Sequence, residues 1–153
     1  MLPKEVRYMN KKVILIVDDE PMIHDLLEIH LRRMKTPFEI YHALTGEEAI
    51  EKYEMLMREN KKPDLVVMDL NLSGRDEMEV IEAHMEGLTG KIDGVRTTQR
   101  ILKIDPEARI WGYTAWFGTK WSEKLKEYVK KVVERTVPFH EFAKMVDAFF
   151  SIK

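Results

Sequence analysis

Three carboxylates and one hydroxyl follow directly after short apolar runs, at positions where the strands of a sheet would end. Asp18 and Asp19 follow KVILIV, Asp69 follows LVVM, and Thr114 follows RIWGY. Because ligands collect outside the carboxyl ends of strands in open α/β sheets, we expect these side chains to converge. Two carboxylates about 4 Å apart repel by roughly 4 kcal/mol at an effective dielectric constant near 20. A divalent cation would offset that repulsion, and Mg²⁺ prefers such hard oxygen ligands. The pattern therefore predicts a magnesium site suited to phosphoryl transfer to a carboxylate.

The runs that would position these residues alternate with amphipathic segments. Strands are expected at residues 12–17, 38–43, 65–68, 109–113 and 131–135. Helices are expected at 22–34, after a capping box of Thr45 and Glu48, before Pro106, at 122–130 and from Phe139 onward. Strands that are apolar throughout are typical of a parallel sheet covered on both faces. We therefore predict one α/β domain over residues 11–153, preceded by a short tail at 1–10.

Residues 73–90 form an additional segment between the third strand and the next helix. Ser73 and Asp76 are suited to cap a helix, and Gly87 to end it. The apolar residues between them recur at helical spacing: Met78, Ile81, Met85 and Leu88. The segment is predicted to be an extra amphipathic helix, serving either as packing against the domain or as a lid or partner surface.

Composition excludes several classes of function. The chain has 25 Lys and Arg against 27 Asp and Glu, a formal charge of −2, which gives no electrostatic case for nucleic acid or an anionic membrane. The absence of cysteine excludes disulfides and thiolate metal sites. The apolar runs are too short to span a bilayer, and the first ten residues lack an apolar signal core, so a cytoplasmic location is expected. The five histidines show no metal-ligand spacing and are predicted to be surface or packing residues.

Three stretches, VILIVDDEP, KPDLVVMDLNLSG and IWGYTA, occur in this order and resemble the receiver domains of bacterial and archaeal response regulators. The resemblance covers nearly the whole chain from Lys12, apart from the extra segment. It implies a flavodoxin-like, doubly wound, five-stranded parallel sheet in the order 2-1-3-4-5, with helices on both faces and one extra helix.

The same resemblance assigns roles to individual residues. Asp69 would be the phosphoacceptor, and Asp18 and Asp19 the acidic pair that holds Mg²⁺ together with Asp69. Asn71 would offer its backbone carbonyl to the metal. Thr114, followed by Ala115, would be the switch hydroxyl that turns toward the phosphoryl group.

One position departs from the family pattern. Receiver domains normally carry a lysine before a proline at the end of the fifth strand, where it pairs with the phosphoacceptor. This chain reads RTVPF from Arg135, so Val137 stands at the lysine position. A charge-assisted hydrogen bond of that kind contributes roughly 1.5–3 kcal/mol, and Arg135 or Lys131 are the neighbouring cations that could replace it.

The resulting hypothesis is a stand-alone receiver domain, not an enzyme beyond self-phosphorylation and self-dephosphorylation. It would accept a phosphoryl group from a sensor histidine kinase or phosphotransfer protein and signal by contact with a downstream protein. Two alternatives stay open. One is a pseudo-receiver interaction module that works without phosphate, favoured by Val137. The other is a small phosphohydrolase with Asp69 as its covalent nucleophile.

Overall fold

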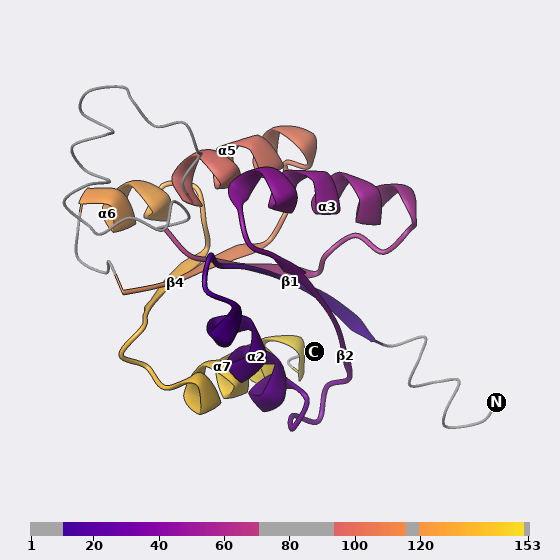
Figure 1. Cartoon of the computed structure of the whole chain (residues 1–153), viewed down its shortest axis with the longest axis vertical. Coiled ribbons are helices and arrows are strands. Elements are labelled where there is room, and N and C mark those ends of the chain that lie inside the picture. The colour runs from indigo at the N-terminus through magenta and orange to yellow at the C-terminus, as the bar shows by residue number, and fades with distance from the viewer. Residues whose placement is uncertain (1–10, 71–93, 116–119, 152–153) are drawn as a thin grey trace.

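A five-stranded parallel sheet forms the centre of the protein, shown in Figure 1 by a computed structural model that describes residues 11–70, 94–115 and 120–151. The strand order is β2-β1-β3-β4-β5, as expected from the resemblance. The strands are β1 (Lys12–Val17), β2 (Phe38–Ala43), β3 (Leu65–Met68), β4 (Ile110–Thr114) and β5 (Lys131–Glu134). The chain crosses from β2 past β1 to β3, so the carboxyl ends of β1 and β3 lie side by side at the point where the strand order reverses.

Helices cover both faces of this sheet. One face carries α2 (Pro21–Leu31) and α7 (Phe139–Ser151), and the other carries α3 (Gly46–Arg58), α5 (Gly94–Ile104) and α6 (Lys120–Lys126) (Figure 1). Ile14 and Ile16 point toward α2 and α7, whereas Leu15 and Val17 point toward α3 and α5. This alternation explains why the central strands β1 and β3 are apolar at nearly every position, because each face of the sheet packs against its own helical layer.

Several element ends differ from the expected ones by a few residues. Helix α2 ends at Leu31 rather than at residue 34, because the next residues turn toward β2. Asp147 of α7 holds that turn, accepting hydrogen bonds from the backbone N–H and the hydroxyl of Thr36. Helix α6 lies at Lys120–Lys126 instead of 122–130. Thr45 caps α3 as the sequence indicated, accepting a hydrogen bond from the Glu48 N–H at 3.0 Å.

The extra segment at 73–90 and the tail at 1–10 lie outside the described residues. Among the described residues, no helix is both long and apolar enough to cross a membrane.

A buried polar contact joins α3 to the end of α5. The Tyr53 hydroxyl, fully buried, donates a 2.6 Å hydrogen bond to Asp105 Oδ2. Burial on its own would raise the pKa of Asp105, but hydrogen bonds from Tyr53 and from the Glu107 N–H, together with Lys62, lower it. The carboxylate is therefore held charged within the domain, and its partners hold the two helices in register.

Replacing Tyr53 with Phe tests this contact. Tyr53→Phe removes one partner of a buried charged acceptor, so we expect the free energy of unfolding to fall by about 1–3 kcal/mol. Tyr128→Phe is the matched control, because Tyr128 is 38% exposed and its hydroxyl only accepts a surface hydrogen bond from Gln99. Urea unfolding of both variants measures the two changes in the free energy of unfolding. Equal decreases would show that the buried hydrogen bond stabilises the protein no more than the exposed one.

Candidate metal centre

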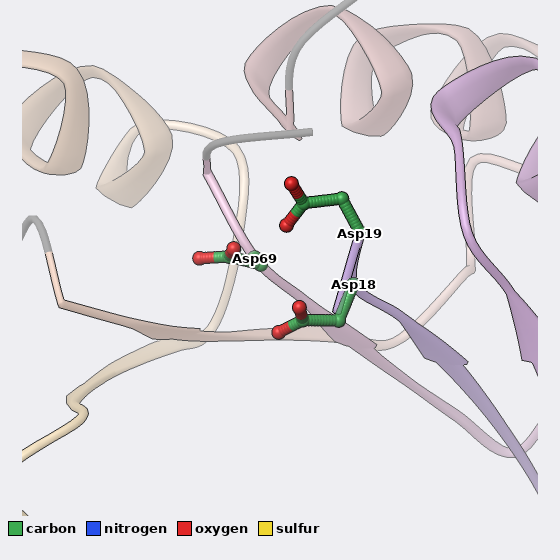
Figure 2. Close-up of side chains that lie close together, drawn as sticks. All are labelled: Asp18, Asp19 and Asp69. Carbon is green, nitrogen blue, oxygen red and sulfur yellow. The ribbon is translucent and has the colours of Figure 1, made fainter. Parts of the chain in front are cut away.

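The three aspartates predicted to converge lie together at the carboxyl edge of the sheet. Asp18 and Asp19 follow β1 and Asp69 follows β3, and the pairing of Val17 with Met68 puts the ends of these strands side by side. Figure 2 shows the three side chains directed to the same side of the strand ends. One carboxylate oxygen from each lies within 4.8 Å of the others. The structure thus brings together a set of hard oxygen atoms of the kind that Mg²⁺ prefers.

Backbone hydrogen bonds fix the two aspartates that end their strands. The Asp69 N–H donates to the Val17 carbonyl at 3.0 Å, which extends the β1–β3 pairing by one residue. Asp69 Oδ1 accepts from the Leu70 N–H at 2.9 Å, and Asp18 Oδ1 accepts from the Glu20 N–H at 2.9 Å. Each carboxylate therefore has one oxygen tied to the local backbone.

Arg135 is the cation that reaches this cluster. It follows β5, and its N–H donates to the Thr114 carbonyl at 2.9 Å, so the β4–β5 pairing continues to this residue. Its Nη2 donates to Asp18 Oδ2 at 3.0 Å and to the Tyr113 carbonyl at 2.6 Å, and lies 3.9 Å from Asp69 Oδ1. Lys131 is at the beginning of the same strand, where its Nζ lies 4.9 Å from the centre of the Trp111 ring. Of the two cations considered from the sequence, only Arg135 is in contact with the cluster.

Val137, at the position where the family has lysine, is a packing residue here. Its half-buried side chain packs against the apolar cluster that contains Tyr113 and Phe142. Its carbonyl accepts a hydrogen bond from the Tyr113 hydroxyl. No peptide bond among the described residues is cis, so Val137 and Pro138 are joined in trans.

The charges of the cluster act on one another strongly. Burial, and next the charge of Asp18, raise the pKa of Asp69 to about 8, although Arg135 and a hydrogen bond with the Thr114 side chain act in the opposite direction. Burial and the charge of Asp18 also raise the pKa of Asp19. A cation bound among these carboxylates would favour the charged form of Asp69 and so lower its pKa.

The other residues assigned from the sequence have different surroundings. Thr114 is fully buried at the end of β4 with its side chain bonded to Asp69, and Ala115 is exposed. Asn71 lies outside the described residues.

Gly94 is a site residue that sequence reasoning missed. It begins α5, and its N–H donates to the Leu70 carbonyl at 2.9 Å. A Cβ atom at this position would lie 2.2 Å from the Asp69 carbonyl oxygen and 2.8 Å from the Leu70 Cα. Only glycine lets the helix approach the backbone beside Asp69 this closely. In the sequence, the only indication of this role was that Gly94 stands where a helix is expected to begin.

A pair of histidines beneath Asp18 was also missed. His24 Nε2 lies 2.8 Å from the Asp18 carbonyl, His24 Nδ1 lies 2.8 Å from His42 Nδ1, and His42 Nε2 lies 2.7 Å from Glu28 Oε1. Both outer partners are acceptors, so each Nε2 atom donates a hydrogen to its partner. Burial lowers the pKa of His24.

Comparison with known proteins agrees with this fold. The family model described as the response regulator receiver domain matches residues 14–86. The response regulator protein TrrA from Thermotoga maritima, solved in complex with Mg²⁺ and BeF, is similar over 90% of this chain and 97% of its own, with 28% identity and a TM-score of 0.66. A CheY-like receiver domain protein from Methanospirillum hungatei shares the fold over 92% of this chain and 94% of its own, with 20% identity and a TM-score of 0.66.

A third structure, the CheX–CheY–BeF₃–Mg²⁺ complex from Borrelia burgdorferi, matches over 93% of this chain and 90% of that one, with 21% identity and a TM-score of 0.66. The doubly wound sheet with acidic residues at its switch point defines the class as flavodoxin-like α/β domains. Within that class, the family match over residues 14–86 and the shared fold support a response regulator receiver domain. Receiver domains are generally signalling modules rather than enzymes, and they typically bind Mg²⁺ at the acidic pocket.

The close approach at Gly94 predicts a large loss of stability on adding one methyl group. In Gly94→Ala the new Cβ meets backbone, which cannot rotate away, so we expect a destabilisation of about 3 kcal/mol or more. In the control, Gly112→Ala, the new Cβ would meet the Leu125 Cδ2 at 2.8 Å, a side-chain tip that can shift. Thermal and urea unfolding would rank the two variants, and the reverse ranking would contradict the close approach.

The raised pKa of Asp69 predicts how stability depends on pH when divalent ions are chelated. Between 3.8, the ordinary value, and about 8, the folded chain holds a proton on Asp69 that the unfolded chain releases. The stability of the native protein therefore falls as the pH rises through this window. Asp69→Asn lacks this dependence, so its stability relative to the native protein should increase from about pH 5 to about pH 8. Urea unfolding in EDTA at both pH values measures the difference in the free energy of unfolding between the variant and the native protein. A difference that does not change with pH would contradict the raised pKa of Asp69.

Proposed function

We propose that this receiver domain accepts a phosphoryl group on Asp69 in a reaction that depends on Mg²⁺. The observation that carries the proposal is the cluster of carboxylate oxygens from Asp18, Asp19 and Asp69, all within 4.8 Å of one another. A similar protein, TrrA, was solved with Mg²⁺ and BeF, which supports a metal and a phosphoryl mimic at the corresponding site here. In this arrangement Asp18, Asp19 and Asp69 would hold the metal, together with the backbone carbonyl of Asn71.

The chemistry follows from the placement of the residues. One carboxylate oxygen of Asp69 attacks the phosphorus atom of a phosphohistidine, the P–N bond breaks, and the imidazole leaves as the acyl phosphate forms. The bound metal supplies charge that screens Asp69 from the incoming phosphate. Thr114, already bonded to Asp69, provides a hydroxyl that can follow the phosphoryl group, and Ala115 gives an unobstructed position beside it.

The partners follow from the same proposal. A sensor histidine kinase or a phosphotransfer protein in the cytoplasm would donate the phosphoryl group. The change at Thr114 would then alter affinity for a downstream protein.

A pseudo-receiver that signals without phosphate is the second candidate, favoured by Val137. Because that side chain packs into the apolar cluster, no cation is presented from this position. Arg135 opposes this reading, since it brings a guanidinium group to within 3.9 Å of Asp69. Binding of Mg²⁺ to the carboxylates separates the two candidates, because the pseudo-receiver has no need of the metal.

Acetyl phosphate tests the proposed function directly. Incubation with acetyl phosphate and Mg²⁺ should increase the mass of the intact protein by one phosphoryl group. The increase should be absent from Asp69→Asn and from samples in EDTA. Asp25→Asn, which changes an exposed aspartate on α2, is the matched control and should be modified like the native protein. Modification that persists in Asp69→Asn, or none in the native protein, would contradict the proposal.

A further inference from the structure

Arg135 is bound in a way that places it between the phosphoacceptor and a metal ligand. Within the described part of the chain, its guanidinium group donates hydrogen bonds from Nη2, to Asp18 Oδ2 and to the Tyr113 carbonyl. Its Nε is buried and has no hydrogen-bond partner among the residues that the structure describes. A buried donor without an acceptor is costly, and here it lies in a side chain already close to Asp69.

Asp18 is fully engaged by these contacts. Its Oδ1 accepts from the Glu20 N–H, and its Oδ2 accepts from Arg135. A divalent cation that binds Asp18 must approach one of these oxygens, and the guanidinium charge at Oδ2 repels it at short range in a buried setting. The arginine and the metal therefore cannot both bind Asp18 Oδ2 at full strength.

We propose that Arg135 competes with the divalent cation for Asp18, and that the arginine displaced from Asp18 is the cation that pairs with the phosphoryl group on Asp69. The proposal rests on the proposed function and refines it. Metal binding and the movement of the positive charge are then coupled. When the metal binds Asp18, Arg135 leaves Asp18 and moves toward Asp69. In this chain the arginine thereby takes the role that the lysine before the proline has in the family.

The surroundings of Arg135 allow a short displacement of this kind. Its guanidinium carbon lies 4.5 Å from the centre of the Tyr113 ring, a contact that does not depend on Asp18. The Tyr113 ring is itself fixed, stacked on Phe142 at 4.0 Å and bonded through its hydroxyl to the Val137 carbonyl. The ring is thus a platform on which the guanidinium can turn from Asp18 toward Asp69, only 3.9 Å from Nη2.

The opposite reading is that Arg135 and Asp18 form a permanent structural ion pair. Removing one partner of a buried pair generally destabilises a protein, so a loss of stability alone cannot distinguish the two readings. Affinity for Mg²⁺ can, because a structural pair that supports the site would weaken metal binding when broken, whereas a competitor would strengthen it when removed.

The experiment compares Arg135→Gln, Arg135→Lys and the native protein by calorimetric titration with Mg²⁺, followed by titration with beryllofluoride in saturating Mg²⁺. Arg135→Gln should bind Mg²⁺ with a dissociation constant lower by roughly five-fold or more, and should bind beryllofluoride more weakly. Arg135→Lys keeps the charge and should lie between the two. Lys131→Gln removes a cation from the far end of the same strand and should change neither constant.

A nuclear magnetic resonance readout follows the arginine itself. The Nε–H signal of Arg135 should shift when Mg²⁺ is added and shift again with beryllofluoride, whereas in Asp18→Asn the first shift should be lost. Unchanged or weaker Mg²⁺ binding by Arg135→Gln would overturn the competition while the proposed function stands. Metal binding by Arg135→Gln but not by the native protein would support the competition and overturn the proposed function. No binding by either would overturn both.

Discussion

Repulsion among three carboxylates at the carboxyl ends of β1 and β3 is the constraint on which the rest of the site depends. Asp18, Asp19 and Asp69 come together because their strands are neighbours. Burial makes the repulsion stronger and raises the pKa of Asp69. In the folded chain Arg135 supplies a compensating charge, and its hydrogen bond goes to Asp18 rather than to Asp69.

The core explains why the site tolerates this cost. Two apolar clusters, one on each face of the sheet, fix the strands independently of the charges at their ends. The approach of α5 to the backbone of Asp69 through Gly94 adds a steric constraint from one side. From the other side, His24 Nε2 bonds the Asp18 carbonyl, and His24 also contacts His42, which bonds Glu28. The apolar clusters therefore stabilise the fold, and the fold holds the three carboxylates close together despite their repulsion.

The fold could be predicted from the sequence because its signals are local. Continuous apolar runs, the Thr45 cap and prolines near helix ends define strands and helices, and parallel strands with helices on both faces leave few topologies. The gathering of Asp18, Asp19 and Asp69 follows from that topology. Gly94, His24 and His42 could not be found in this way, because their importance depends on contacts between distant residues. His24 and His42 are on a helix and a strand, with no short spacing that would mark them as a pair.

Arg135 shows how a missing family residue can be judged only in three dimensions. In the sequence, Val137 stands at the lysine position, and Arg135 or Lys131 could each supply the charge instead. The structure places the apolar side chain of Val137 in the core and its carbonyl against the Tyr113 hydroxyl, which positions the ring under Arg135. A longer, planar cation from two residues earlier then reaches the same cluster, with several donors instead of a single ammonium. Because the guanidinium binds Asp18 and the Tyr113 carbonyl together, a positive charge is kept at the cluster, with Asp18 rather than Asp69 as its hydrogen-bond partner.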